Sequence, residues 1–235
     1  MSRLAKPRFL IVYVLAVCFF LIARITEVHL RWGIFFVVLG ESLRFWANGY
    51  VGHVKVNRTA ETGKNPKAGQ LVTAGPYAFV RNPLYLGSFI IGLGFCVIVG
   101  QIWFLVAALG TFLIVYRRKI VEEEDVLFHE WGEAFKRYQD AVPRLFPTWK
   151  RYHEAQGKWS WRGIAASKEW KTVLWAAVFM ILIYFWEEVV QERESLFNEK
   201  PVLRACLLGI VVILMMTDGF FELLKRRLKC SARVE

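Results

Sequence analysis

The chain has 235 residues, of which 56% are hydrophobic and 22% charged, with a mean hydropathy of +0.35 and a formal net charge of +11. This composition is too apolar for an ordinary soluble domain and too charged for a bare bundle of membrane spans. The four cysteines are far apart and the four histidines form no i, i+4 pair, so neither a disulfide framework nor a metal site is expected.

Apolar runs of fifteen or more residues recur along the chain. A bilayer core of about 30 Å needs about 20 mostly apolar residues in a helix. No signal peptide is expected, because no small-residue cleavage site follows the first apolar run. The fold class predicted is therefore all-α, a polytopic transmembrane helix bundle. Its six spans are expected at roughly 9–24, 32–52, 84–99, 102–119, 172–187 and 202–221.

The distribution of basic residues supports this number of spans. Of the 31 Lys and Arg residues, 25 fall in the four segments 1–8, 55–81, 117–171 and 225–235. Six alternating spans place all four segments on one side of the membrane, and the positive-inside rule makes that side cytoplasmic. We therefore expect an integral, multi-pass membrane protein with both termini in the cytoplasm. The positive charge then reflects topology and attraction to anionic lipid, and no nucleic-acid partner is expected.

The most informative segment is 75–87, GPYAFVRNPLYLG, a polar and aromatic string that leads into an apolar run. Residues 73–76 are typical of a tight turn, and residues 77–81 of a short interfacial helix. Pro83 suits the first turn of the next helix, where its missing N–H costs nothing. Only Gly100 and Gln101 separate that helix from the following one, so the two helices should form a tight antiparallel hairpin.

A block of four acids, Glu122 to Asp125, follows the second helix of this hairpin, and the hairpin should bring it beside segment 75–87. Four adjacent acids cannot all find cations nearby, and like charges at this density are destabilising unless a positive ligand is supplied. A solvated helix face is the alternative for the block alone. Residues 120–142 should continue as one amphipathic helix, and the Trp-rich basic segment 148–171 should lie on lipid headgroups.

Together the two motifs predict a small-molecule site where two adjacent helices meet water, because polar groups there are costly unless they bind something. Arg81, Asn82, Tyr77 and Tyr85 add one cation, an amide and aromatic faces to the carboxylates. S-adenosylmethionine carries groups that suit this set. Its sulfonium suits a carboxylate or an aromatic face, its amino group a glutamate, its carboxylate Arg81 or helix N-terminal amides, and its adenine a tyrosine.

Both motifs resemble the shared core of the isoprenylcysteine carboxyl methyltransferase and phospholipid N-methyltransferase families. The matching patterns are VTxGPYxxVRNPxYLG at 72–87 and EExxLxxxWGxxFxxYxxxVP at 123–143. The resemblance covers about residues 36–147 and implies an integral membrane methyltransferase that uses S-adenosyl-L-methionine in a pocket at the cytoplasmic face. Residues 1–147 would form the methyltransferase core, and residues 148–235 would add an interfacial segment and two further transmembrane helices.

The resemblance also assigns the site. Catalytic roles are expected for Arg81, Glu123 and Glu124, and the acid pair could also be taken one residue earlier, at Glu122. The cofactor-binding residues expected are Tyr77, Arg81, Asn82, Pro83, Tyr85, Leu86, Glu123 and Glu124.

Asn82 stands where the carboxyl methyltransferases usually have His, which favours a membrane lipid over a prenylated cysteine as acceptor. The acceptor expected is a lipophilic molecule methylated on a lipid amine or, as a second choice, on a lipophilic carboxylate. An NADPH-dependent membrane reductase related to the sterol reductases is the alternative function, and a non-enzymatic membrane protein is a third.

Overall fold

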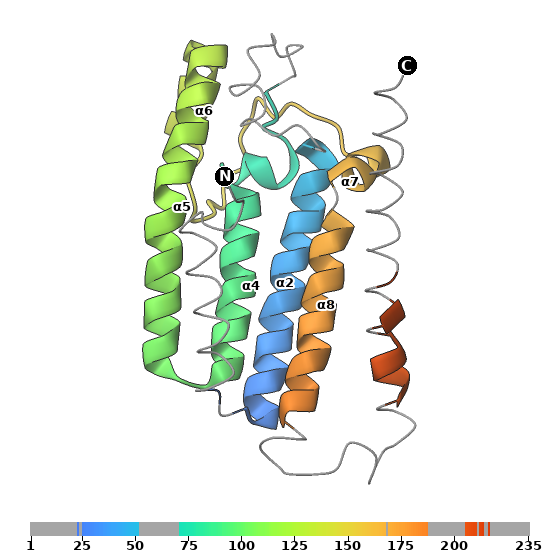
Figure 1. Cartoon of the computed structure of the whole chain (residues 1–235). Helices are drawn as coiled ribbons and strands as arrows, with labels where there is room; N and C mark the ends of the chain where they lie inside the picture. The colour runs from blue at the N-terminus through green and yellow to red at the C-terminus, as the bar shows by residue number, and fades with distance from the viewer. Residues whose placement is uncertain are drawn as a thin grey trace, which may run out of the picture. The chain divides into compact units, whose positions relative to one another are not determined.

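The computed structural model describes residues 23, 25–51, 71–167, 169–187, 205–210, 212, 213 and 216. These residues contain helices and no strand, which confirms the predicted all-α class. Figure 1 labels the helices. The helices are α2 (Glu27–Val51), the 3-10 helix η1 (Gly75–Ala78), α4 (Pro83–Val99), α5 (Ile102–Trp131), α6 (Glu133–Ala141), α7 (Trp161–Ser167) and α8 (Glu169–Trp186).

Four predicted spans coincide with helices. The segment 32–52 corresponds to α2, 84–99 to α4, 102–119 to the first part of α5 and 172–187 to α8. None of the helices in the described ranges is both long and apolar enough for a membrane crossing. Of the other two predicted spans, the structure describes only residue 23 of 9–24, and only 205–210, 212, 213 and 216 of 202–221, so the six-span bundle stays a prediction.

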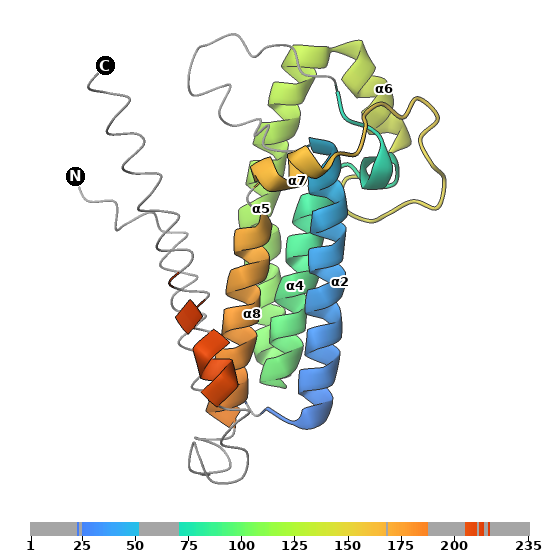
Figure 2. The same ribbon diagram turned by 90° about the vertical axis from the view of Figure 1, so that its right-hand side faces the viewer.

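The chain divides into two compact units, Met1–Glu169 and Trp170–Glu235. In the first unit α2 and α4 run antiparallel and side by side, and α5 returns along the hairpin (Figures 1 and 2). In the second unit Leu174 and Val178 are buried on α8, with Ile181 packed against them. All residues of the predicted site belong to the first unit.

Two pairs of glycines set the close approach of α2 and α4. A Cβ added to Gly40 would lie 2.7 Å from the Gly87 carbonyl oxygen, and one added to Gly94 would lie 2.7 Å from the Gly33 carbonyl oxygen. Real Cβ atoms do not approach backbone that closely, so only glycine permits this helix spacing. The contacts hold the first turn of α4, where the sequence places the site, against α2.

The α4–α5 hairpin forms as predicted. Gly100 ends α4 in the left-handed conformation (φ 68°), its N–H donates to Val97 O at 3.0 Å, and α5 begins at Ile102. Pro83 occupies the first turn of α4. The short helix predicted for residues 77–81 is wrong in its limits, because the structure has a 3-10 helix at Gly75–Ala78 instead.

The single amphipathic helix predicted for residues 120–142 is also wrong. α5 continues to Trp131, the chain turns at Gly132 with a φ of +50°, and α6 runs separately to Ala141. A positive φ is strained for a residue with a Cβ, which explains the break at this glycine. The predicted end of the helical region before Val142 and Pro143 is confirmed.

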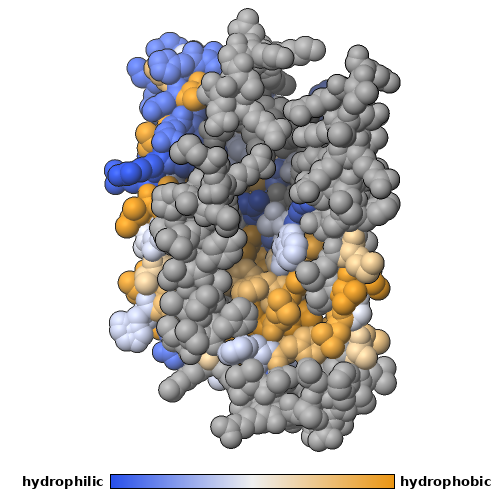
Figure 3. Space-filling model, viewed as in Figure 1, coloured by the Kyte–Doolittle hydropathy of each residue, from blue (hydrophilic) through white to orange (hydrophobic). Residues whose placement is uncertain are grey.

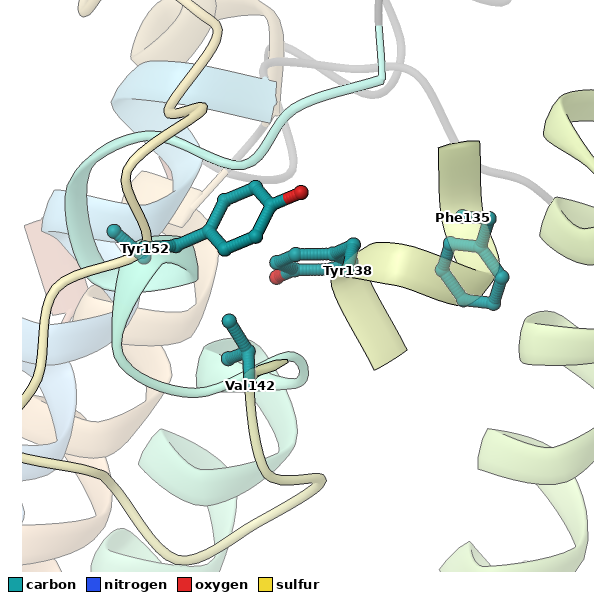
Figure 4. Packing of buried hydrophobic residues seen from close by; sticks show 5 residues of the cluster. Phe135, Tyr138, Val142 and Tyr152 are labelled. Atoms are coloured by element: carbon teal, nitrogen blue, oxygen red, sulfur yellow. The ribbon is translucent and has the colours of Figure 1, made fainter. Parts of the chain in front are cut away.

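Residues 143–160, which we call the strap, run from α6 back across η1 (Figure 2). The Thr73 N–H donates to Gln156 O at 2.9 Å, and the Tyr152 N–H donates to Ala78 O at 3.0 Å. The strap, η1 and α6 enclose a small core of Ala78, Phe135, Tyr138, Val142 and Tyr152. In Figure 4 the rings of Tyr138 and Tyr152 lie against each other above Val142.

This core corrects the interfacial belt predicted for residues 148–171. Tyr152 is buried in the core, and the Trp159 indole lies on Gly49 at the end of α2, where an added Cβ would be 1.9 Å from the indole nitrogen. The Ser160 N–H donates to Gly49 O at 2.8 Å. Trp149, by contrast, is fully exposed. The segment therefore belongs partly to the packed interior, because aromatic composition alone does not distinguish the two environments.

Candidate functional site

The site lies where the first turn of α4 meets the acidic stretch of α5. The Tyr85 hydroxyl donates to Glu123 Oε1 at 2.8 Å, and the Asn82 Nδ2 amide donates to Glu124 Oε1 at 3.0 Å. Asn82 is the N-cap of α4, and Pro83 fixes the backbone that follows it. The hairpin therefore brings the two motifs together as the sequence predicts.

Glu124 is the most enclosed carboxylate of the site, with a side chain that is only 4% exposed. Arg144 donates to Glu124 Oε2 from Nε at 3.0 Å and from Nη2 at 2.6 Å. Arg81 Nε lies 3.3 Å from Glu124 Oε1. We call Glu124, Arg81, Arg144 and Asn82 the Glu124 clamp. A buried carboxylate must be paired with a cation and hydrogen-bonded, and the two guanidinium groups of the clamp meet this requirement.

Arg81 is held on two sides. Its Nη1 donates to Gln139 O in α6 at 2.9 Å, and its backbone N–H donates to Pro143 O at 2.9 Å. Burial lowers the pKa of the Arg81 guanidinium, while the negative charge of Glu124 acts in the opposite direction. The guanidinium therefore links the residues just before α4 to α5 and α6.

Glu123 faces a different environment. Tyr85, which it accepts a hydrogen bond from, packs edge-on against Tyr116 with ring centroids 5.3 Å apart, and Tyr116 stacks on Phe112 at 4.1 Å. The Lys119 ammonium lies 5.7 Å from the centroid of the Tyr85 ring. The Tyr85 ring thus already faces a cation, and Glu123 provides a carboxylate beside it, a combination that favours positively charged groups.

The other acids of the block lie elsewhere. Glu122 is exposed and lines a hollow of about 480 Å³ along α5 together with Ile114, Arg117, Arg118 and Val121. Glu123 and Glu124 accept hydrogen bonds from Tyr85 and Asn82, so the geometry favours them over Glu122 as the acid pair. Contrary to the expectation that the block lacks nearby cations, Glu124 has Arg144 as a partner, from 20 residues further along the chain.

Three further residues predicted to bind the cofactor, Tyr77, Pro83 and Leu86, contribute to the packing of the fold. Tyr77 is buried, and its carbonyl oxygen accepts a hydrogen bond from the Tyr138 hydroxyl at 2.7 Å. Pro83 is fully buried, and Leu86 is half-buried on α4. None of these contacts involves Glu123 or Glu124. The cofactor-binding roles of the three residues therefore stay predictions, and so does the predicted cofactor pocket. In the described part of the chain, no cluster of His, Cys, Asp or Glu could hold a metal ion.

Sequence reasoning missed Arg144, Lys119 and Gln139. The sequence feature that could have indicated the role of Arg144 is Gly132. The chain turns at this glycine, and Arg144, directly after Pro143, contacts α5 again. Lys119 lies one helical turn before Glu123, a spacing that places both on one face of α5. Gln139 contributes only its backbone carbonyl, which no side-chain pattern reveals.

Comparison with known proteins agrees with the two motifs. Residues 28–133 match the family described as phospholipid methyltransferase. The chain is 34% identical over 119 residues to the human protein named Protein-S-isoprenylcysteine O-methyltransferase, which covers 49% of this chain and 40% of the human one. It is 33% identical over 131 residues to the Schizosaccharomyces pombe protein of that name, covering 54% and 53%.

These matches confirm the resemblance to methyltransferases, and they give the reductase alternative no support. The aligned region spans about half or less of the length of these curated relatives. It contains segment 75–87 and the acidic block, so both halves of the candidate site lie within the matched residues.

Proposed function

We propose that the protein transfers a methyl group from S-adenosyl-L-methionine to a lipophilic acceptor at a membrane. The observation that carries this proposal is the bonding of Tyr85 to Glu123 and of Asn82 to Glu124, which joins the two methyltransferase motifs into one site. The matched residues 28–133 support the same reading.

The residues present fit this cofactor in charge. Glu123 and the Tyr85 ring would hold its cationic part, since a carboxylate and an aromatic face both favour a positive charge. Bound there, the cofactor would supply a methyl group already activated by its sulfonium. The Glu124 clamp would hold the start of α4 against α5, because Arg81 and Asn82 directly precede α4, Glu124 lies on α5 and Arg144 on the strap.

Methyl transfer from a sulfonium is an in-line displacement, so positioning and exclusion of water are the main tasks of this chain. An amine acceptor must first lose a proton, and in this proposal Glu123 or Glu124 would accept it, whereas a carboxylate acceptor needs no base. Arg81 and Glu124 would act in this scheme by orienting the first turn of α4.

The identity of residue 82 is a weaker guide to the acceptor than the sequence suggests. The Asn82 amide donates to both Glu124 Oε1 and Arg144 O, so this side chain serves the clamp. The proposal therefore keeps both acceptor classes, a lipid amine and a lipophilic carboxylate. The relatives named as O-methyltransferases favour the carboxylate, and the phospholipid methyltransferase family favours the amine.

The proposal places the site at the cytoplasmic side of a membrane, with both termini on that side and six spans. Cysteine labelling at residues 60, 150, 193 and 235 tests this topology. Only residue 193 should react from outside the cell, and reaction of any of the other three from that side contradicts it.

Two measurements test the activity. Calorimetry on the purified protein should detect binding of S-adenosyl-L-methionine and not of NADPH. Incubation with methyl-labelled cofactor and a total lipid extract should then give label in an organic-soluble product. Base-stable label identifies an amine acceptor and base-labile label a methyl ester, while label confined to water-soluble molecules contradicts a lipophilic acceptor.

A further inference from the structure

The tip of the strap, residues 144–151, exposes two large aromatic side chains. Phe146 is 84% exposed and Trp149 is 100% exposed, whereas Tyr152, directly after the tip, is 6% exposed. Burial of aromatic surface is a major source of folding free energy. Aromatic rings that a folded segment leaves in contact with solvent are therefore typical of a surface that contacts something else.

The tip does not expose these rings because its backbone lacks support. At its start the Arg81 N–H donates to Pro143 O at 2.9 Å, and in its middle the Thr148 N–H donates to Phe79 O at 2.9 Å. At its end the Tyr152 N–H donates to Ala78 O at 3.0 Å. The backbone is thus bonded to η1 and the residues after it just before the tip, at Thr148 and just after the tip, so the tip presents Phe146 and Trp149 from a defined conformation.

Two cationic side chains lie next to Trp149 in the sequence. Lys150 and Arg151 follow Trp149 directly, and both are exposed. Tryptophan with an adjacent cation is the combination that prefers the boundary between lipid headgroups and acyl chains, because the ring enters the boundary while the cation pairs with phosphate. The net charge of +11 adds a general attraction to anionic lipid.

We propose that the tip 144–151 docks on the headgroup layer of an anionic membrane, with Phe146 and Trp149 inserted at the interface and Lys150 and Arg151 on lipid phosphates. The same tip contains Arg144, whose Nη2 donates a hydrogen bond to Glu124 Oε2 at 2.6 Å. Docking therefore fixes the height of the site above the lipid, and this last consequence rests on the proposed function. The docking itself does not, since the inserted rings Phe146 and Trp149 and the cations Lys150 and Arg151 take no part in the Glu124 clamp.

Spin labels measure this docking without any assay of activity. Single cysteines at positions 146 and 149 are labelled in the full chain from which the four native cysteines have been removed, and the protein is reconstituted in vesicles of phosphatidylcholine and phosphatidylglycerol. Lys136, an exposed residue of α6, is the matched control position. Labels at 146 and 149 should react more with dissolved oxygen than with a water-soluble nickel chelate, and the label at 136 should show the reverse.

Two outcomes overturn the proposal. Labels at 146 and 149 that behave like the label at 136 would show that the tip lies in water. Labels shielded from both reagents would show that another protein surface covers the tip.

A charge variant tests the anionic partner separately. Lys150→Gln with Arg151→Gln should remove the difference in depth of the 149 label between vesicles with and without phosphatidylglycerol. Lys136→Gln with Arg137→Gln, a matched pair of exposed neighbours on α6, should leave that difference intact. Equal effects of the two pairs would refute specific contact by the tip. Cofactor binding by calorimetry should be unchanged in both pairs, so a failure of the methyltransferase proposal is recognised independently.

Discussion

Arg144 donates two hydrogen bonds to the carboxylate of Glu124, from Nε at 3.0 Å and from Nη2 at 2.6 Å, although the two residues are 20 positions apart in the sequence. The contact fastens the strap to α5 at the point where α5 also meets the first turn of α4. Glu124 and Glu123 are neighbours in the sequence, yet the first is enclosed by arginines and the second bonds to Tyr85. The two acids should therefore respond differently to the same substitution.

Glu124→Gln should destabilise the fold. The side chain of Glu124 is 4% exposed, and loss of its charge leaves Arg81, itself 11% exposed, without its counter-ion. Removal of one partner from a buried ion pair costs about 3–5 kcal/mol, and the partial exposure of Arg144 places the expected loss near the lower end. Thermal unfolding in detergent measures it. Glu122→Gln, on the exposed side of α5, is the control, and equal stabilities of the two variants would contradict the clamp.

Glu123→Gln and Tyr85→Phe should weaken cofactor binding with little loss of stability. A hydrogen bond to a charged ligand group contributes about 1.5–3 kcal/mol, so its loss weakens affinity about tenfold to hundredfold. Glu123→Gln removes the charge that would face the cationic cofactor, and Tyr85→Phe removes the 2.8 Å hydrogen bond that orients the Glu123 carboxylate. Because the two residues share this bond, the double variant should bind hardly more weakly than the worse single variant. Calorimetry decides the point, and fully additive losses would mean that the residues act independently.

Gly40→Ala should loosen the contact of α2 with α4. The added methyl would lie 2.7 Å from the Gly87 carbonyl oxygen, and relief of such a clash costs about 1–3 kcal/mol, which exceeds the gain of up to about 1 kcal/mol in helix propensity. Gly92→Ala is the matched control on α4, because no atom of the described residues lies within 4 Å of its added Cβ. Gly40→Ala should lower the unfolding temperature, while Gly92→Ala should leave it unchanged or raise it.

Tyr138 should make stability depend on pH in the alkaline range. Burial, with a further contribution from Glu124, raises the pKa of Tyr138 above its ordinary 10.0, although the charge of Arg81 opposes this. Below pH 10 the phenol is protonated in both folded and unfolded chains, so its contribution is fully present. Above pH 10 the unfolded chain loses the proton first, which favours unfolding.

Tyr138→Phe removes the 2.7 Å hydrogen bond to Tyr77 O, so it should lower stability at pH 8 by about 1 kcal/mol. It should also make the decline above pH 10 shallower than in the unmodified protein. Unfolding temperatures measured between pH 8 and pH 11 check both effects. An identical slope in the two proteins would show that Tyr138 is not the group responsible.

Sequence patterns predict the helices that are defined by hydrophobic periodicity and length. They do not predict a change of chain direction that depends on the conformation of one residue. α4 begins within a residue of its expected start because Pro83 marks the first turn, and the hairpin follows because Gly100 and Gln101 leave no room for anything else. The break at Gly132 was missed, since the apolar positions on either side keep a helical spacing while one positive φ redirects the chain.

The same break explains what was missed in the site. The bonds of Tyr85 and Asn82 to the acid pair follow from the hairpin, which local rules predict. Arg144 reaches Glu124 only because α6 turns back, so its role depends on a tertiary path that no local pattern contains. For Trp149 and Tyr152 the residue types were informative, but only packing separates the exposed ring from the buried one.

The glycines on α2 and α4 also limit how the lengths of these helices can vary. Gly33 and Gly40 meet Gly94 and Gly87, and the spacing of seven residues is the same on both helices. One residue inserted between the two contacts on α2 would rotate one glycine by about 100° relative to the other and place a side chain against a carbonyl oxygen. Insertions and deletions in this stretch should therefore be tolerated only when they restore the phase of the helix or occur in both helices together.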